Sequence, residues 1–522
     1  ISAYAALLKS SSLNLYSGKL IHHHILRDGL ELVSPLSSLL VLMYANCGSI
    51  HDGYYCVAIL PHPQQNVFTW NFLFKSCAKQ GLLRRAFEMY GHMLSHDVMP
   101  NKVTFVCMLD ACTVHTTFHE VVHLHCLTID GHFDLDPVVG TSLLNLYAKV
   151  GSLLDASNVF HRICEKDVVT WTSMISVYVQ GGERRMALLL FGQMQHEGVI
   201  PDKITYVSAI MACDIPLALC EGRHVHSQIV EKRLENDLVI GSALVNMYGK
   251  CGSLVDAETT FYQMFQRNVV TWNSLIGVYA QHGVGTNAFQ LFMQMKVEGL
   301  LPNRETYINM LTGCSIIEPL INKGIEIHAC LRDTGMDCDI AIGNVLISMY
   351  GKCSAPEHSR KVFDHMADLN VISWTAMIAV HGQHGEFREA MWLFIKMQLV
   401  GVKPNEVTLV SLVSSCTNLK EGRWLHSFAF EKHLESTDPI KNALINMYVQ
   451  FGSIEDAQLS FDSLSERDAI SWTAMITALA EHGKTSEALL YYVQMQEEGK
   501  KPNEVSFVNI LCACATQVAL VE

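Results

Sequence analysis

The chain has 522 residues, of which 49% are hydrophobic and 17% charged, so we expect a folded protein rather than a disordered one. This length excludes a single compact core and favours several domains or a repeat array. The net charge of −14 argues against an ordinary nucleic-acid binder with a basic face, and no apolar run reaches the roughly 18 residues of a membrane span.

Three residue types recur at the same intervals along the chain. The intervals are 101, 101, 102 and 98 residues for each type: Trp70, Trp171, Trp272, Trp374 and Trp472; Met93, Met194, Met295, Met397 and Met495; Pro100, Pro201, Pro302, Pro404 and Pro502. Because three independent markers agree, the sequence contains an internal repeat with a superperiod of about a hundred residues.

The segment 168–202 shows what one unit of the repeat contains. Trp171, Met174 and Ile175 follow the i, i+3, i+4 spacing of an amphipathic helix. Gly181 interrupts this helix, and a second apolar series follows it. Each unit is therefore predicted to be a helical hairpin that buries its apolar face by stacking on its neighbours.

Three classes of unit alternate in chain order. One class, always 35 residues long, is expected at 67–101, 168–202, 269–303, 371–405 and 469–503. The second class is expected at 1–33, 102–136, 203–237, 304–339 and 406–437, with a truncated unit at 504–522. Short units are expected at 34–66, 137–167, 238–268, 340–370 and 438–468. The array fills the chain, so we predict an all-α solenoid.

The recurring motifs resemble those of the pentatricopeptide repeat family. Units begin with strings such as V-V-T-W-N-S-L-I and end in M-x-x-x-G-x-x-P-[ND], and the short units carry M-Y-x-K-C-G-S, as at 247–253. The W-x-x-L-G-x-x-Y core of tetratricopeptide repeats is missing. The alternation of 35, 35 and 31 residues is similar to the P–L–S subclass. The three classes above are accordingly named P, L and S units.

The resemblance implies a right-handed superhelical solenoid that binds single-stranded organellar RNA, with one nucleotide per repeat. It also implies a mitochondrial or chloroplast location. Members of the subclass mostly specify cytidines for C-to-U editing through extra C-terminal domains, so editing cofactor proteins or a separate deaminase are the expected protein partners. A protein-binding helical scaffold, or an RNA stabilisation or processing factor without editing, are the alternatives.

In the family, two side chains per repeat read the base: the fifth residue of the first helix and the last residue of the repeat. The P units supply Asn71/Asn101, Thr172/Asp202, Asn273/Asn303, Thr375/Asn405 and Thr473/Asn503. The S units supply Ser38/Asn66, Thr141/Asp167, Ser242/Asn268, Asn344/Asn370 and Asn442/Asp468. The L units place Ala5, Val106, Val207, Ile308, Val410 and Val508 at the fifth position, and these side chains cannot hydrogen-bond a base.

Donor and acceptor matching on the Watson–Crick edge gives these pairs their expected bases. An aspartate accepts from the ring N–H of guanine or uracil, and an asparagine donates to adenine or cytosine. The family scheme then gives a hypothetical target, 5′-A-Y-n-G-G-n-A-Y-n-Y-A-n-U-A-3′, in which n faces an L unit and Thr172/Asp202 reads guanine. The second residue of each P unit is expected to sandwich the base: Phe68, Val169, Val270, Ile372 and Ile470.

Other interpretations of the same residues compete with readout. Asn or Asp at a repeat boundary is also ordinary N-cap chemistry. The recurring Trp and Met residues are expected in the core rather than stacked on RNA. The recurring histidines, one per L unit, are expected to pack between helices (His22, His125, His226, His328 and His426).

No catalytic, metal or cofactor site is predicted in this segment. None of the 17 cysteines forms a C-x-x-C motif. A zinc deaminase needs H-x-E followed by P-C-x-x-C. His384-Gly-Glu386 and His433-Leu-Glu435 match only the first half. The segment is therefore interpreted as a non-enzymatic RNA-recognition module.

Overall fold

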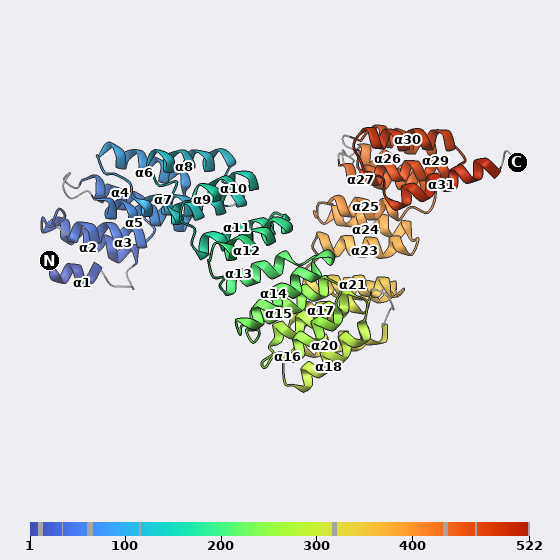
Figure 1. The fold of residues 1–522 in the computed structure, drawn as a ribbon, viewed down its shortest axis with the longest axis horizontal. Helices are drawn as coiled ribbons and strands as arrows, with labels where there is room; N and C mark the ends of the chain where they lie inside the picture. Colours follow the sequence, from blue (N-terminus) through green and yellow to red (C-terminus); the bar gives the residue numbers. More distant parts are fainter. Residues whose placement is uncertain are drawn as a thin grey trace. The chain divides into compact units, whose positions relative to one another are not determined.

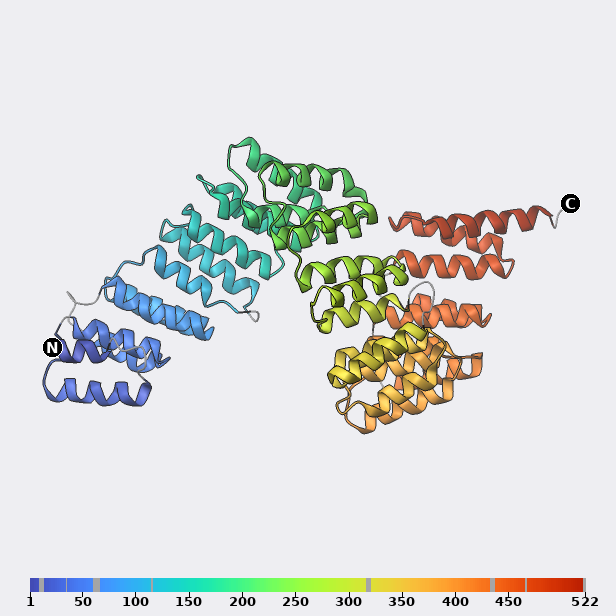
Figure 2. The same cartoon turned by 90° about the horizontal axis from the view of Figure 1, so that it is seen from below.

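The fold was analysed in a computed structural model that describes residues 1–8, 14–33, 35–59, 66–113, 116–315, 321–431, 437–464 and 467–519. Within these residues there are 31 α-helices, two short 3₁₀-helices and no β-strand, which confirms the predicted all-α fold (Figures 1 and 2). No helix in the described part of the chain combines the length and apolar character of a membrane span. The chain divides into two compact units, Ile1–Gln266 and Arg267–Glu522.

The first unit consists of helical hairpins in chain order. Its helices are α1 (Ser2–Leu8), α2 (Leu15–Arg27), α3 (Leu36–Asn46), α4 (Ile50–Ala58), α5 (Val67–Gln80), α6 (Leu83–Ser95), α7 (Lys102–Asp110), α8 (Phe118–Asp130), α9 (Pro137–Lys149), α10 (Leu153–Arg162), α11 (Val168–Gln180), α12 (Arg184–His196), α13 (Lys203–Ala212), η2 (Pro216–Ala218), α14 (Leu219–Glu231), α15 (Leu238–Lys250) and α16 (Leu254–Gln263).

The second unit continues the same pattern. Its helices are α17 (Val269–Gln281), α18 (Gly285–Val297), α19 (Arg304–Gly313), α20 (Ile321–Thr334), η3 (Met336–Cys338), α21 (Ile340–Lys352), α22 (Pro356–His365), α23 (Val371–Gln383), α24 (Phe387–Leu399), α25 (Glu406–Ser414), α26 (Leu419–Glu431), α27 (Asp438–Gln450), α28 (Ile454–Asp462), α29 (Ala469–Glu481), α30 (Thr485–Glu497) and α31 (Glu504–Ala519).

The odd-numbered helices are the first helices of the hairpins, and within each unit they form a continuous layer. In Ile1–Gln266, each first helix contacts the next in the series α3, α5, α7, α9, α11, α13 and α15. In Arg267–Glu522, the odd-numbered helices from α17 to α31 contact one another in the same way. Figure 2 shows these stacked hairpins along both units. Residues at equivalent positions of successive first helices are therefore neighbours, although they are 31 to 36 residues apart in sequence.

The recurring tryptophans form the core between hairpins. All five of them, from Trp70 to Trp472, are at most 2% exposed. In the S-to-P contact, Trp171 of α11 meets Phe160 of α10 edge to face, with ring centroids 5.0 Å apart. The five recurring methionines, from Met93 to Met495, are fully buried as well. The prediction that these residues are core is confirmed.

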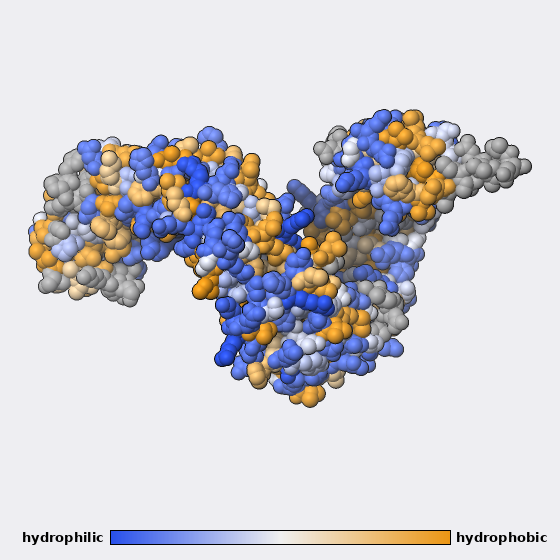
Figure 3. All heavy atoms as spheres, in the orientation of Figure 1, coloured by the Kyte–Doolittle hydropathy of each residue, from blue (hydrophilic) through white to orange (hydrophobic). Residues whose placement is uncertain are grey.

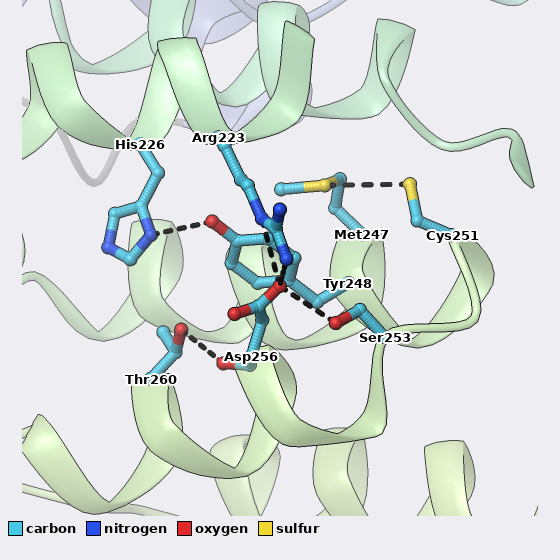
Figure 4. A network of polar contacts seen from close by, with 8 residues as sticks. All are labelled: Arg223, His226, Met247, Tyr248, Cys251, Ser253, Asp256 and Thr260. Carbon is cyan, nitrogen blue, oxygen red and sulfur yellow. Dashed lines mark hydrogen bonds and ion pairs between the residues drawn. The ribbon is translucent and has the colours of Figure 1, made fainter. Parts of the chain in front are cut away.

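A recurring polar network joins each L unit to the following S unit. In Figure 4, His226 of α14 bonds the Tyr248 hydroxyl of α15 through Nδ1 at 2.8 Å. Arg223 of the same helix bonds Asp256 Oδ2 of α16 at 2.8 Å, and Ser253 donates to that carboxylate at 2.7 Å. The His–Tyr bond recurs in His22–Tyr44, His125–Tyr147, His328–Tyr350 and His426–Tyr448 at 2.7–2.9 Å. The histidines therefore pack between helices, as predicted.

Four of these histidines are expected to make folding sensitive to acid. Burial lowers the pKa of His22, His125, His226 and His328 below the ordinary value. The unfolded chain then binds more protons than the folded chain as the pH falls through about 6.5, so the free energy of unfolding falls with pH there. Thermal melting at pH 7.5 and 5.5 should show a lower midpoint in acid, and His226→Gln should reduce that difference. An unchanged difference in this variant would contradict the assignment.

Candidate functional site

The last residue of every predicted reading pair caps the helix that follows it. Asn101 Oδ1, for example, accepts the N–H of Thr104 at 3.1 Å at the start of α7. The same Oδ1 bond, at 2.8–3.1 Å, is made by Asn66, Asp167, Asp202, Asn268, Asn303, Asn370, Asn405, Asp468 and Asn503. The capping interpretation is thus confirmed. It leaves the second polar atom of each side chain, Nδ2 of asparagine or Oδ2 of aspartate, for a different contact.

The fifth residues lie in the first-helix layer, next to these caps. Six of them are 7–9% exposed: Asn71, Thr172, Ser242, Asn273, Thr375 and Thr473. The other four are half-buried: Ser38, Thr141, Asn344 and Asn442. A buried polar side chain needs hydrogen-bond partners, so the contacts of these residues define the site.

Three pairs are joined by a direct hydrogen bond. Asn71 Nδ2 donates to Asn101 Oδ1 at 3.1 Å, and Asn273 Nδ2 donates to Asn303 Oδ1 at 2.9 Å. Asn442 Nδ2 lies 3.4 Å from Asp468 Oδ2. The fifth and the last residues of these repeats are therefore brought together in space.

Four further pairs are joined through a hydroxyl group on the third residue of the next unit. Thr172 Oγ1 lies 2.6 Å from Thr205 Oγ1, which donates to Asp202 Oδ1 at 2.7 Å. Equivalent bridges run from Thr141 through Thr170 to Asp167, from Thr375 through Thr408 to Asn405, and from Thr473 through Ser506 to Asn503.

The remaining three pairs differ. No hydrogen bond joins Ser38 to Asn66 or Asn344 to Asn370 among the described residues. The Oδ1 atom of Asn344 is buried without a hydrogen-bond partner in the described part of the chain. Ser242 and Asn268 lie in different compact parts of the chain, Ile1–Gln266 and Arg267–Glu522.

Exposed apolar side chains flank the pairs. Phe68, Val169, Val270, Ile372 and Ile470 are 58–68% exposed, although each lies two residues before a buried tryptophan. Over the face drawn in Figure 3, hydrophobic and hydrophilic residues are interspersed along both units. These second residues are thus accessible for contact with a ligand.

One cavity in the second unit collects several of these groups. It has a volume of about 510 Å³ and is lined by Asn344, Thr375, Asn405, Ile372, Val407 and Lys352, among others. Ile372 and Val407 are the second residues of consecutive first helices, α23 and α25. The cavity therefore places a polar pair, two aliphatic side chains and one lysine around a common space.

Two of the L units, 203–237 and 304–339, are organised differently at the equivalent positions. Asp237 caps α15, and its Oδ2 atom pairs with Lys203 Nζ at 2.7 Å. Asp339 caps α21 and pairs with Arg304 at 3.1 Å. Each ion pair joins the first and last residues of the same L unit. The carboxylate is thereby engaged next to a fifth residue that has no polar atom in its side chain.

Two sets of side chains at this site were not singled out in the sequence. The third-residue hydroxyl groups of the L units are one set, and Lys352 is the other. Thr104, Thr205, Thr306, Thr408 and Ser506 keep the 101, 101, 102 and 98 spacing of the tryptophans, so this repetition was available as a signal. The M-Y-x-K string already contained Lys352.

The partial deaminase motif at 384–386 does not form a joint site. Glu386 lies 2.6 Å from His381 Nδ1 instead, and His384 Nδ1 lies 2.8 Å from the Val380 carbonyl oxygen. The second match, His433-Leu-Glu435, lies outside the described residues.

Sequence comparison matches models of one repeat family to several segments of the chain. The PPR repeat family model matches residues 65–113, 166–213, 267–315, 369–418 and 467–516, and a PPR repeat model matches 141–168, 242–269 and 344–371. The chain belongs to the pentatricopeptide repeat family. A chloroplastic pentatricopeptide repeat-containing protein of Arabidopsis thaliana is 33% identical over 87% of this chain and 74% of its own length. A mitochondrial one from the same plant is 30% identical over 97% of this chain and 74% of its own length.

Solved structures of pentatricopeptide repeat proteins match as well. The crystal structure of PPR10 from maize covers 99% of this chain and 76% of its own, with a TM-score of 0.59 and 19% identity, which supports the shared helical-repeat fold. A structure of PPR10 in complex with an 18-nt psaJ RNA element matches with a TM-score of 0.38, 18% identity and coverage of 98% and 88% of the two chains.

Proposed function

We propose that this pentatricopeptide repeat chain binds one single-stranded RNA sequence and reads one base with each of its ten polar pairs. The L units act as spacers between reading units, because their fifth residues are apolar and their last carboxylates at Asp237 and Asp339 are ion-paired. The P–L–S alternation supports a role as the specificity part of an organellar C-to-U editing factor. A chloroplast or mitochondrial location agrees with the names of the two Arabidopsis relatives.

The cavity around Thr375 and Asn405 carries this proposal. Its polar pair lines the cavity together with Ile372 and Val407, which supply an aliphatic surface for the faces of a flat base. RNA-binding proteins commonly splay single-stranded bases out and hydrogen-bond their Watson–Crick edges in this way. Asn344 lines the same cavity, and its buried Oδ1 atom has no hydrogen-bond partner among the described residues.

Filter binding with the full chain tests the proposal. The RNA 5′-A-Y-n-G-G-n-A-Y-n-Y-A-n-U-A-3′ should bind at least about tenfold more tightly than its shuffled version, because each correctly matched base edge contributes about 1–3 kcal/mol. Binding should also weaken only gently with salt, since base edges and apolar contacts rather than many phosphates supply the affinity. Equal binding of the two RNAs would refute sequence-specific recognition and favour a protein-binding scaffold.

A further inference from the structure

A buried hydroxyl group lies between the two members of every P-unit reading pair. It belongs to the third residue of the next L unit, and it contacts both the fifth residue and the cap: Thr104, Thr205, Thr306, Thr408 and Ser506. All five residues are fully buried. Each of the five junctions therefore contains the same set of three connected polar side chains: the fifth residue, the hydroxyl-bearing third residue and the cap.

Counting protons at Thr205 fixes the direction of each bond. A hydroxyl group has one proton to donate and two lone pairs to accept with. Thr205 Oγ1 donates to Asp202 Oδ1 at 2.7 Å and accepts the Asp202 N–H at 3.2 Å. Its 2.6 Å contact with Thr172 Oγ1 must then have Thr172 as the donor. The only proton of the Thr172 hydroxyl is thus committed to the protein, and its oxygen is left as an acceptor.

This commitment distinguishes guanine from adenine. Guanine offers two donors on its Watson–Crick edge, the ring N–H and the amino group, which match the oxygen of Thr172 and Oδ2 of Asp202. Adenine offers one donor and a bare ring nitrogen that needs a proton. A free threonine hydroxyl could supply that proton, but a hydroxyl already donating to Thr205 cannot.

At another junction, the equivalent hydroxyl of Thr306 fixes the orientation of an asparagine at the fifth position. Thr306 donates to Asn273 Oδ1 at 2.6 Å, and Asn273 Nδ2 donates to Asn303 Oδ1 at 2.9 Å. Both amide oxygens are then engaged within the protein, so the Asn273 N–H that does not donate to Asn303 and the Nδ2 group of Asn303 are left for a ligand. A donor surface of this kind suits the ring nitrogen and carbonyl oxygen of cytosine.

At some junctions between an S unit and the following P unit, the third-residue hydroxyl makes no hydrogen bond to the fifth residue among the described residues. Thr69 occupies the same third position before α5's tryptophan, is equally buried and is capped by Asn66, but its hydroxyl donates to the Asn66 backbone carbonyl at 2.7 Å. No hydrogen bond reaches Ser38 from it among the described residues. Thr69 therefore provides a matched control: the same residue type at the same capped position, with its hydroxyl bonded to the Asn66 backbone instead of the Asn66 side chain.

We propose that the third-residue hydroxyl groups of the L units are positioning residues for base recognition, because they fix which reading atoms donate and which accept. This inference rests on the proposed function and names residues beyond the two that face the base. It assigns to Thr205 the selection of guanine over adenine by Thr172 and Asp202.

The test compares Thr205→Val with Thr205→Ser and Thr69→Val in the full chain. For each variant, Kd is measured for RNAs that carry guanine or adenine opposite Thr172/Asp202, and for RNAs varied opposite Ser38/Asn66. The guanine-to-adenine ratio should fall by about fivefold to tenfold in Thr205→Val, because one committed hydrogen bond is lost. Thr205→Ser should restore it, and Thr69→Val should leave the selectivity at its own position unchanged.

For each variant, the Kd values for the guanine and the adenine RNA are measured on the same protein preparation. A smaller folded fraction changes both Kd values equally and therefore cancels in their ratio. If the wild-type chain selects guanine and Thr205→Val selects it equally well, the positioning role is refuted and the proposed function stands. If Thr69→Val loses selectivity to the same extent as Thr205→Val, the effect is one of helix capping, and the positioning role is again refuted. A wild-type chain that binds all these RNAs alike overturns the proposed function itself.

Discussion

Replacing Thr172 with asparagine, with Asp202 kept, is expected to change the preferred base at that position from guanine to uracil. The new amide would present N–H donors, as Asn71 and Asn273 do in their pairs, while Asp202 Oδ2 still accepts. Uracil offers one ring N–H flanked by carbonyl oxygens, which matches this combination of donor and acceptor. The preference should reverse by at least about tenfold in the ratio of Kd values, since a matched pair contributes about 1–3 kcal/mol.

A control for this switch is available in the adjoining L unit. Val207 occupies the fifth position there, and the last residue of the unit, Asp237, is ion-paired with Lys203. Val207→Thr adds a hydroxyl at the equivalent place without a free partner, so it should create no base preference. If Thr172→Asn leaves the preference for guanine intact in a binding panel, the family scheme does not apply to this chain.

Replacing Trp171 with alanine is expected to give the largest loss of stability of any variant considered. The side chain is fully buried and meets Phe160 of the preceding S unit. Removing a buried tryptophan typically costs about 3–5 kcal/mol. In a stacked array each hairpin is stabilised mainly by its neighbours, so the loss should uncouple α10 from α11 and lower the thermal midpoint.

Val169→Ala provides the matched comparison, because Val169 lies on the same helix but is 61% exposed. It should change the thermal midpoint little and weaken RNA binding, whereas Trp171→Ala should lower both. A destabilised Val169→Ala, or a Trp171→Ala variant that melts like the wild type, would contradict this division between a core residue and a ligand-facing one. Circular dichroism melting and filter binding on the same samples would decide.

Much of the fold could be predicted because the relevant interactions are local or strictly periodic. The i, i+3, i+4 series around Trp171 specifies a helix and its buried face, and Asp167 before that helix is an N-cap within three residues of its partner Thr170. The spacing of the five tryptophans then carries the same result to every superperiod. The family resemblance followed from the recurring motifs, and the twenty side chains of the ten pairs followed from what that resemblance implies, while their role in reading bases stays a prediction.

The sequence by itself therefore determined that each repeat is a capped helical hairpin and which residues its apolar face buries. The tertiary structure alone decided which polar atoms meet: Thr172 with Thr205, 33 residues away, and His226 with Tyr248, 22 residues away. The members of each pair lie on different helices, so these contacts exist only after α11 packs on α13 and α14 packs on α15. For the same reason, the structure rather than the sequence separates an L-unit aspartate held by Lys203 from a P-unit aspartate such as Asp202, whose carboxylate is bound through the Thr205 hydroxyl.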